Sequence, residues 1–121
     1  MTNENEQWKL EGNCNLEIIK LKKMLKEAKI PFEYIYLINR DKIYPAHQII
    51  IKGKTNKILC DAVQNFFSYG NEKDLIEIRG ALTEEENEMD CVLGYLSAKE
   101  VFKRFKYCYE HNTSVYRKEE N

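Results

Sequence analysis

The sequence lacks the short motifs by which common enzyme families are recognised. It contains no GxxxxGK[ST] phosphate loop, no GxGxxG, no GxSxG and no HExxH. No stretch brings together a nucleophile, a base and an oxyanion donor, and the two histidines have no readable partnership with a cysteine. We therefore expect a protein that is not an enzyme and that carries no cofactor.

Long apolar runs and a strong net charge are absent too. No run approaches the roughly 18 apolar residues of a membrane-spanning helix. The net charge is −1, which gives no bulk attraction to nucleic acid or to an acidic membrane. The first residues, MTNENEQWKLEGN, lack the basic and apolar regions of a signal peptide. We expect a cytoplasmic protein that binds neither a membrane nor long nucleic acid.

Metal-binding patterns are missing as well. The four cysteines, Cys14, Cys60, Cys91 and Cys108, are scattered and form no CxxC pair, so they predict no metal site. Cys60 and Cys108 lie among apolar neighbours and are predicted to be small, reduced core residues. The acidic run EEENEMD has neither the ligand spacing nor the glycine of a calcium loop, and predicts a solvated acidic linker or a single helical turn.

The 121 residues that are present suffice for one domain. We expect a flexible N-terminus over residues 1–12, one α+β domain over 13–112 and a polar tail over 113–121. Hydrophobic residues make up 43% of the chain and aromatic residues 12%, so a core can form. That core is modest at this length, and a homo-oligomer, a dimer or larger, would bury more of the aromatic side chains.

Helical spacing marks the two ends of the domain. Asn13 or Asn15 can cap a helix that begins near Leu16 and closes at Pro31. Its apolar positions are Ile18, Leu21, Leu25 and Ala28. Five lysines fill the rest of this helix, and a solvated face is a better explanation for them than an anion site.

A second helix is predicted after the capping box SAKE, Ser97 to Glu100. Its apolar face consists of Ala98, Val101, Phe102, Phe105, Cys108 and Tyr109. Lys99, Lys103 and Lys106 form a basic stripe on the opposite side.

Period-two alternation predicts strands in PFEYIYLIN, AHQIIIK and LIEIRGAL. The segment KILCDAVQNFF is ambiguous between helix and strand, and we predict a strand because its neighbours are strands. Short links between strands favour antiparallel pairing. The expected fold is therefore α+β, a small antiparallel sheet of three to four strands with an N-terminal and a C-terminal helix on one face.

Residues that suit a ligand are concentrated in NFFSYGNEKDLIEIRG, residues 65–80. Aromatic faces such as Phe67 and Tyr69 can stack on a purine. Arg79 offers a fork of donors for phosphate, and Glu77 can orient it or accept ribose hydroxyls. Asn71 and the amides around Gly70 can donate to an anion. The competing interpretation is that a phenylalanine is core and that Glu77 pairs with Arg79 at the surface.

The order of these motifs resembles a family of small proteins carried by phages and prophages of Gram-positive bacteria. The resemblance covers SYG, DLIEIRGAL, the acidic segment, GYL and SAKEVFKR, roughly residues 60–105. The family is that of the first type of anti-Thoeris protein. Its members are oligomeric sponges that bind the glycocyclic ADP-ribose signal of TIR-domain enzymes without turnover, in pockets at subunit interfaces; related members take up cyclic oligonucleotides.

The resemblance implies a function and a site. This chain would sequester a cyclic ADP-ribose-type signal in the cytoplasm of an infected bacterium and so block Thoeris defence. Ser68, Tyr69 and Gly70 match SYG, and Tyr95 belongs to the matching GYL. Arg79 departs from the family, where an apolar residue such as methionine is usual. Arg79 is then either an extra phosphate contact or a surface residue.

The ligand's chemistry defines the candidate set. An adenine, two riboses and a pyrophosphate need an aromatic shelf, polar groups and one to three cations, but no catalytic base. Lys103 and Arg104 are predicted to extend away from the apolar face of the second helix, toward a partner subunit. The candidate ligand-binding residues are Phe67, Ser68, Tyr69, Gly70, Asn71, Arg79, Tyr95, Lys103 and Arg104.

Two other functions compete with this one. A protein-binding inhibitor of a host defence or replication protein would use the acidic residues 84–90 to mimic nucleic-acid charge. Changing those acids to amides would then abolish activity, whereas Tyr69→Ala would not. An enzyme that cleaves the nucleotide would release a product, and the missing catalytic groups make it the weakest of the three. The sequence does not fix which cyclic isomer binds or which aromatic ring stacks.

Overall fold

The computed structural model describes residues 16–38, 45–65 and 67–118. In order, the chain forms α2 (Glu17–Glu27), β1 (Glu33–Ile38), β2 (Pro45–Lys52), β3 (Ile58–Asn65), the 3₁₀ turn η2 (Asn71–Lys73), β4 (Ile76–Arg79), α3 (Glu84–Met89), β5 (Val92–Leu96) and α4 (Ala98–His111). Residues 1–15, 39–44, 66 and 119–121 lie outside this part of the chain, and the predictions made for them stay predictions.

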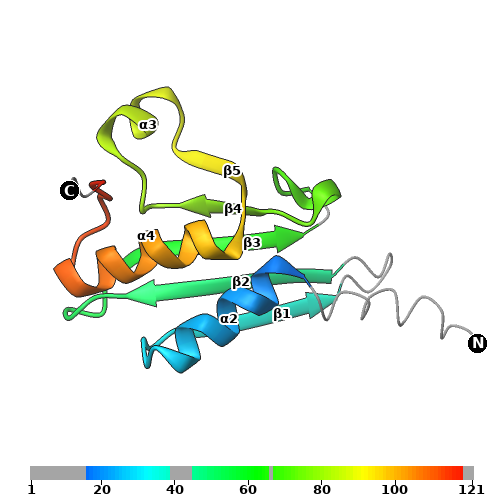
Figure 1. Ribbon diagram of the computed structural model, residues 1–121, viewed down its shortest axis with the longest axis horizontal. Helices are drawn as coiled ribbons and strands as arrows, with labels where there is room; N and C mark the ends of the chain where they lie inside the picture. The colour runs from blue at the N-terminus through cyan, green and yellow to red at the C-terminus, as the bar shows by residue number, and fades with distance from the viewer. Residues whose placement is uncertain (1–15, 39–44, 66, 119–121) are drawn as a thin grey trace, which may run out of the picture.

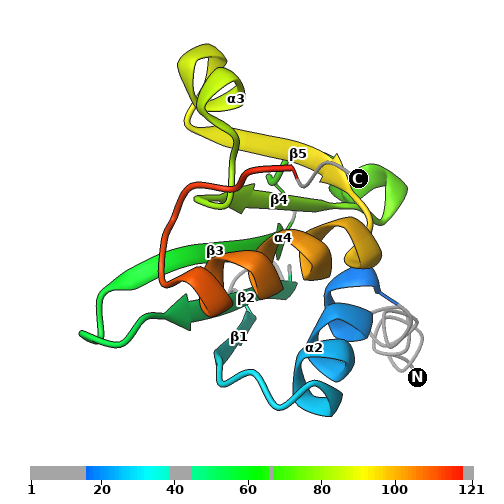
Figure 2. The same ribbon diagram turned by 60° about the vertical axis from the view of Figure 1, so that its left-hand side comes forward.

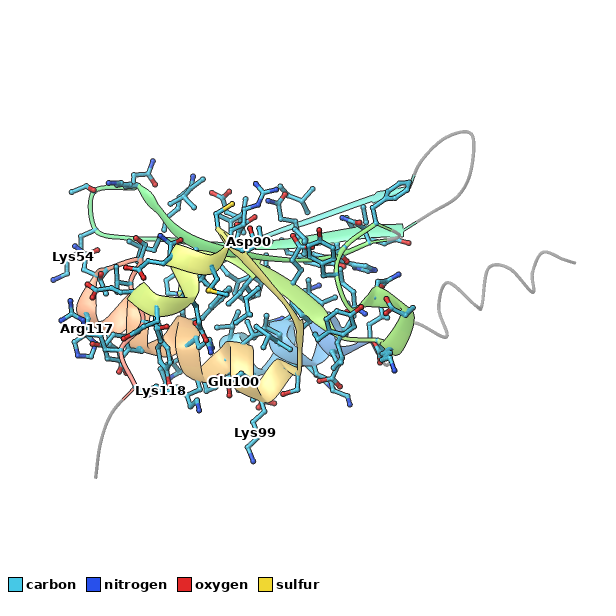
Figure 3. The ribbon with its side chains drawn as sticks, turned by 90° about the horizontal axis from the view of Figure 1, so that it is seen from above. Lys54, Asp90, Lys99, Glu100, Arg117 and Lys118 are labelled. Carbon is cyan, nitrogen blue, oxygen red and sulfur yellow. The ribbon has the colours of Figure 1, made fainter. Side chains whose placement is uncertain are left out.

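The strands form one five-stranded antiparallel sheet in the order β1-β2-β3-β4-β5, so each strand pairs with the next along the chain. Helices α2 and α4 pack against each other and cover the same face of the sheet (Figure 1). The view from above separates the helix layer from the sheet (Figure 3). The short helix α3 stands away from the body beyond β4 and β5 (Figure 2).

Side-chain alternation places the core between sheet and helices. On β4, Ile76 and Ile78 are fully buried, whereas Glu77 is half-buried and Arg79 is exposed on the other face, as predicted. Ile49, Ile51, Cys60 and Ala62 continue the buried face through β2 and β3. The sheet therefore has one face under the helices and one face that no described helix covers.

The two long helices close the core with one apolar stripe each. Ile18, Leu21 and Leu25 of α2 are completely buried, and so are Val101, Phe105 and Cys108 of α4. Burying a large side chain of this kind contributes about 1.5–3 kcal/mol, so these stripes dominate the packing energy. Cys60 and Cys108 are both buried in this core as free thiols, which confirms both as core residues.

The helix caps differ in part from the expected pattern. The hydroxyl of Ser97 accepts a hydrogen bond from the Glu100 amide at 3.2 Å, as predicted. The Glu100 carboxylate, however, binds Arg104 instead of completing the box. A complete capping box forms at the start of α3, between Thr83 and Glu86. The acidic run is thus a short capped helix.

The α+β class and the terminal helices are confirmed, and residues 58–65 form the predicted strand. The sheet has one more strand than the three to four expected, because β5 pairs with β4. Residues 113–118, predicted as part of a polar tail, lie against the body instead. Tyr116 is only 4% exposed, and its amide donates to the Leu82 carbonyl at 2.9 Å. None of the helices formed by the described residues is long and apolar enough to span a membrane.

Candidate functional site

The loop that follows β3 packs directly on the bulged strand β5. Two residues of β5, Gly94 and Tyr95, stand opposite the single residue Glu77 of β4, which is a β-bulge. The Tyr95 amide donates to the Tyr69 carbonyl at 3.3 Å. The SYG and GYL motifs, separate in sequence, therefore meet in space.

Glycine is required at both contact points. A Cβ atom on Gly70, whose φ is +101°, would lie 2.8 Å from the Tyr95 nitrogen. A Cβ atom on Gly94 would lie 2.8 Å from the Tyr69 carbonyl oxygen and would collide with the Tyr69 Cβ. The two backbones approach this closely only because neither residue has a side chain.

The backbone of Tyr95 is strained. Its φ is +60°, a left-handed conformation that costs a residue with a Cβ roughly 1–2 kcal/mol. The conformation leaves the ring 52% exposed, and the Tyr95 hydroxyl donates to Glu72 Oε2 at 2.8 Å. This hydrogen bond raises the pKa of Tyr95 and lowers that of Glu72. The ring is therefore held in one outward orientation by a bond that keeps its phenol protonated.

Hydrogen bonds also fix the near end of the loop. The Ser68 hydroxyl accepts from the Asn65 amide at 2.9 Å and donates to the Asn65 carbonyl at 3.0 Å. Glu77 Oε1 accepts from the Tyr69 amide at 2.8 Å. Ser68 is 9% exposed and serves the turn, so its hydroxyl is not presented to a ligand. Glu77 Oε1 thus holds the loop, which is a role that the sequence did not predict.

The far end of the loop is tied to both long helices. Asp74 Oδ1 accepts from the Glu17 amide at 3.0 Å and from Gln64 Nε2 at 2.9 Å. Gln64, which is 1% exposed, accepts from the Ile18 amide through Oε1 at 3.1 Å. Glu17 Oε1 in turn accepts from the Ala98 amide at 2.7 Å. One buried network thus connects the loop to the first turns of α2 and α4.

These anchoring residues were missed at the level of sequence, although one signal was present. Gln64 follows Cys60 and Ala62 at period two, so the alternation places a polar side chain on the buried face of β3. Buried polar groups need partners. A buried Gln64 therefore predicts a polar partner in a nearby loop, but nothing in the sequence identifies that partner as Asp74.

Three exposed rings lie on this loop and on β5, and Arg79 lies two residues beyond Glu77 on β4. Phe67, Tyr69 and Tyr95 are 81%, 58% and 52% exposed. Arg79 is exposed on the open sheet face, on the same side of β4 as Glu77, and its side chain makes no ion pair or hydrogen bond with another described residue. The four residues Phe67, Tyr69, Tyr95 and Arg79 are together called the tyrosine shelf below. It combines faces for stacking with one cationic donor group.

Two other residues predicted to donate to a ligand, Asn71 and Lys103, are either already hydrogen-bonded within the chain or distant from the tyrosine shelf. The amide of Asn71 already donates to the Ser68 carbonyl at 3.3 Å, and the Tyr69 amide is taken by Glu77. Lys103 is exposed but pairs with Glu100 at 3.2 Å. It lines a groove along α4 to which no residue of the tyrosine shelf contributes. The structure therefore does not bring Lys103 together with the predicted aromatic residues.

The prediction that Arg104 extends away from the apolar face is wrong. Arg104 is 4% exposed. Its guanidinium donates to both carboxylate oxygens of Glu86 at 2.8 and 3.0 Å, to Glu100 at 2.8 Å and to the Ala81 carbonyl at 3.0 Å. It also lies 4.8 Å from the centre of the Tyr116 ring. Arg104 joins α3, α4 and the C-terminal segment, so it is not presented to a ligand.

The ion-pair cluster of Arg104, Glu86 and Glu100 makes the stability of the fold depend on pH. Hydrogen bonds from Arg104 lower the pKa of Glu86 to about 2 from its usual 4.5. Burial alone would raise the pKa of Glu100, but Arg104 and Lys103 outweigh it and lower that pKa. Both carboxylates bind protons more weakly in the folded chain, so both contribute stability that is lost in acid. The contribution of Glu86 is complete above about pH 4.5 and is lost toward pH 2, where its lowered pKa lies.

We predict that Glu86→Gln flattens this acid dependence. Urea unfolding of the wild type should shift to lower midpoints as the pH falls from 6 to 3, and the variant should start lower and shift less. Glu88→Gln, on the exposed side of the same helix, is the matched control and should keep the wild-type slope. Parallel curves for the wild type and Glu86→Gln would contradict the assignment.

Comparison with known proteins adds no relative. No family model matches the chain, and neither a curated protein nor a solved structure does. Among residues 16–38, 45–65 and 67–118, no three histidine, cysteine or acidic side chains gather as a metal ion would require. The fold and the site thus define an α+β protein with a five-stranded meander and an exposed, hydrogen-bonded tyrosine shelf.

Proposed function

We propose that this chain is a phage or prophage sponge. It binds a cyclic ADP-ribose-type signal made by TIR enzymes, glycocyclic ADP-ribose or an isomer, and blocks Thoeris defence without turnover. The observation that supports this most is Tyr95, a bulky residue in a strained conformation that is 52% exposed and fixed by two hydrogen bonds. Strain in a native fold concentrates where function requires a fixed geometry.

The chemistry of the ligand suits the tyrosine shelf. Tyr69 and Tyr95 offer ring faces that can stack on adenine, at about 1–3 kcal/mol for each stacked base. Arg79 can form paired hydrogen bonds to the pyrophosphate. Glu77 and Glu72 hold the two tyrosines in place before the ligand arrives, and such preorganisation lowers the entropy cost of binding. A second subunit would enclose the open side of the shelf.

Isothermal titration with glycocyclic ADP-ribose tests the proposal. We expect saturable heat at micromolar ligand, and recovery of the unchanged ligand by mass spectrometry after the protein is denatured. Purification after co-expression with an active TIR enzyme should yield the same molecule from the denatured protein. No heat, or a chemically altered ligand, would refute a sponge.

Tyr95→Asn separates binding from folding. Asparagine tolerates a left-handed φ better than tyrosine does, so the variant should be as thermally stable as the wild type or more stable. It should nevertheless lose about 5- to 150-fold in ligand affinity, since about 1–3 kcal/mol of stacking is removed. Titration calorimetry and thermal unfolding measure the two effects.

The matched control for Tyr95→Asn is Tyr109→Asn, a tyrosine on α4 that is 36% exposed and lies outside the tyrosine shelf. It should bind ligand as the wild type does. Equal affinity for Tyr95→Asn and the wild type would remove Tyr95 from the site.

A further inference from the structure

Charge on this chain is divided between two neighbouring features, although Glu86 of α3 pairs with Arg104 of α4 and Glu84 pairs with Arg117 of the C-terminal segment. The net charge is only −1, yet a basic groove lies along α4 and an acidic helix, α3, stands away from the body (Figure 2). A chain with little net charge associates without bulk repulsion, so such a division favours contact between copies.

The groove has a volume of about 830 Å³ and lies along α4, with the C-terminal segment as one wall. Lys99, Lys103, Lys106 and Lys118 line it, and Phe102, Tyr107 and Met24 add apolar surface. Lys103 and Lys106 pair with Glu100 and Glu110, which also line the groove, so the unpaired positive charge comes from Lys99 and Lys118, which have no ion-pair partner among the described residues. Figure 3 shows Lys99 pointing away from α4.

The acidic feature is the α3 arm, residues 83–90. Glu85, Glu88 and Asp90 are exposed and have no ion pair with another described residue, and Glu84 reaches Arg117 only at 3.8 Å. Met89 is 86% exposed at the end of the helix. The arm therefore presents carboxylates around one apolar side chain, which complements lysines around an apolar floor.

The positions of the α3 arm and the groove allow two copies of the chain to dock reciprocally, with each arm in the groove of the other copy. Tyr116 and Lys118 border both the groove and the hollow beside α3. Asp90 and Lys99 nevertheless lie well apart within one chain (Figure 3), so the arm does not fill its own groove. A two-fold axis beside the C-terminal segment would seat each arm in the other copy's groove, and the contact would form twice.

We propose that the α3 arm of one copy of this chain docks in the α4 groove of a second copy, with Met89 on the groove floor and the carboxylates of the arm on its lysines. This interface stands independently of the ligand proposed above. It predicts a homodimer whose dissociation constant rises with salt, because its rim contacts are charge pairs.

Sedimentation velocity with charge-reversed variants of the full chain tests the interface. The arm variant carries Glu85→Lys and Glu88→Lys, and the groove variant carries Lys99→Glu and Lys106→Glu. Each variant alone should dimerise at least about tenfold more weakly than the wild type, since two rim contacts become repulsive at each of two sites. An equimolar mixture of the two should recover a dimer, because both contacts between unlike chains are again between opposite charges.

A variant with Lys23→Glu and Lys26→Glu, on the exposed side of α2 and outside the groove, is the matched control and should dimerise as the wild type does. A monomeric wild type at low salt would overturn the proposal, and so would a mixture that stays monomeric. Loss of the dimer in the groove variant with an unchanged arm variant would assign the groove to a different occupant and also overturn it. Ligand titration of the arm variant reports separately on the tyrosine shelf.

Discussion

Replacing Arg104 by alanine is expected to destabilise the fold by about 3–5 kcal/mol, because it removes one partner of a buried ion-pair cluster. The 4% exposed guanidinium donates hydrogen bonds to Glu86, to Glu100 and to the Ala81 carbonyl. A domain of this size has a total stability of about 5–15 kcal/mol. Urea unfolding followed by circular dichroism at pH 7 should therefore show a large fall in midpoint.

Two further variants show where the loss at Arg104 comes from. Arg104→Met keeps a long side chain against the Tyr116 ring, so it should recover the packing part of the loss but not the charge part. Lys103→Ala removes the neighbouring cation, which pairs with the same Glu100 at 3.2 Å but is 60% exposed. Its cost should be about 0–1 kcal/mol. Equal costs for Arg104→Ala and Lys103→Ala would contradict the structural role assigned to Arg104.

Gly94→Ala is expected to disrupt the tyrosine shelf while leaving the sheet folded. The added methyl group would lie 2.8 Å from the Tyr69 carbonyl oxygen and would collide with the Tyr69 Cβ. Neither atom is at the flexible end of a side chain, so neither can move aside unless the loop backbone moves. The loop must move, and overpacking of this kind costs about 1–3 kcal/mol. The Tyr95 amide would lose its Tyr69 acceptor.

Amide hydrogen exchange measures the effect of Gly94→Ala without any ligand, as faster exchange at Tyr95, and titration should show the accompanying loss of binding. Gly53→Ala is the matched control. The nearest neighbours of a Cβ at Gly53 are side-chain atoms of Asn112 and Leu59, and the exposed Asn112 end can turn away at the loss of the hydrogen bond that it accepts from the Lys54 amide. Unchanged exchange at Tyr95 in Gly94→Ala would show that the loop does not need the glycine contact.

Local pattern in the sequence specified most of the fold. The alternation Ile76, Glu77, Ile78, Arg79 fixed the strand and its two faces, because period two admits one assignment. The spacing of Ile18, Leu21 and Leu25 did the same for α2. Strand β5 was missed because its five residues include Gly94, and only pairing with β4 makes them a strand.

Arg104 shows how a local pattern can be misread. It lies three residues after Val101, one before Phe105 and four before Cys108, so it occupies a position on the apolar stripe of α4. The charge suggested a solvent position, whereas the spacing indicated burial. Burial prevailed because α3 brings Glu86 to the guanidinium, and a buried charge is tolerated where a partner and hydrogen bonds are supplied.

Spacing within single segments was enough to predict the α+β class, the two terminal helices, the faces of the strands, and the concentration of aromatic and polar residues in 65–80. Which of those residues lie next to one another could be known only from the folded chain. Tyr95 contacts Tyr69 because of a β-bulge and two glycines. Asp74 binds Gln64 and Glu17, and Arg104 is buried against Glu86 instead of lying in the candidate site. Such contacts join segments far apart in the chain, and which polar group meets which is set by how the sheet and helices pack.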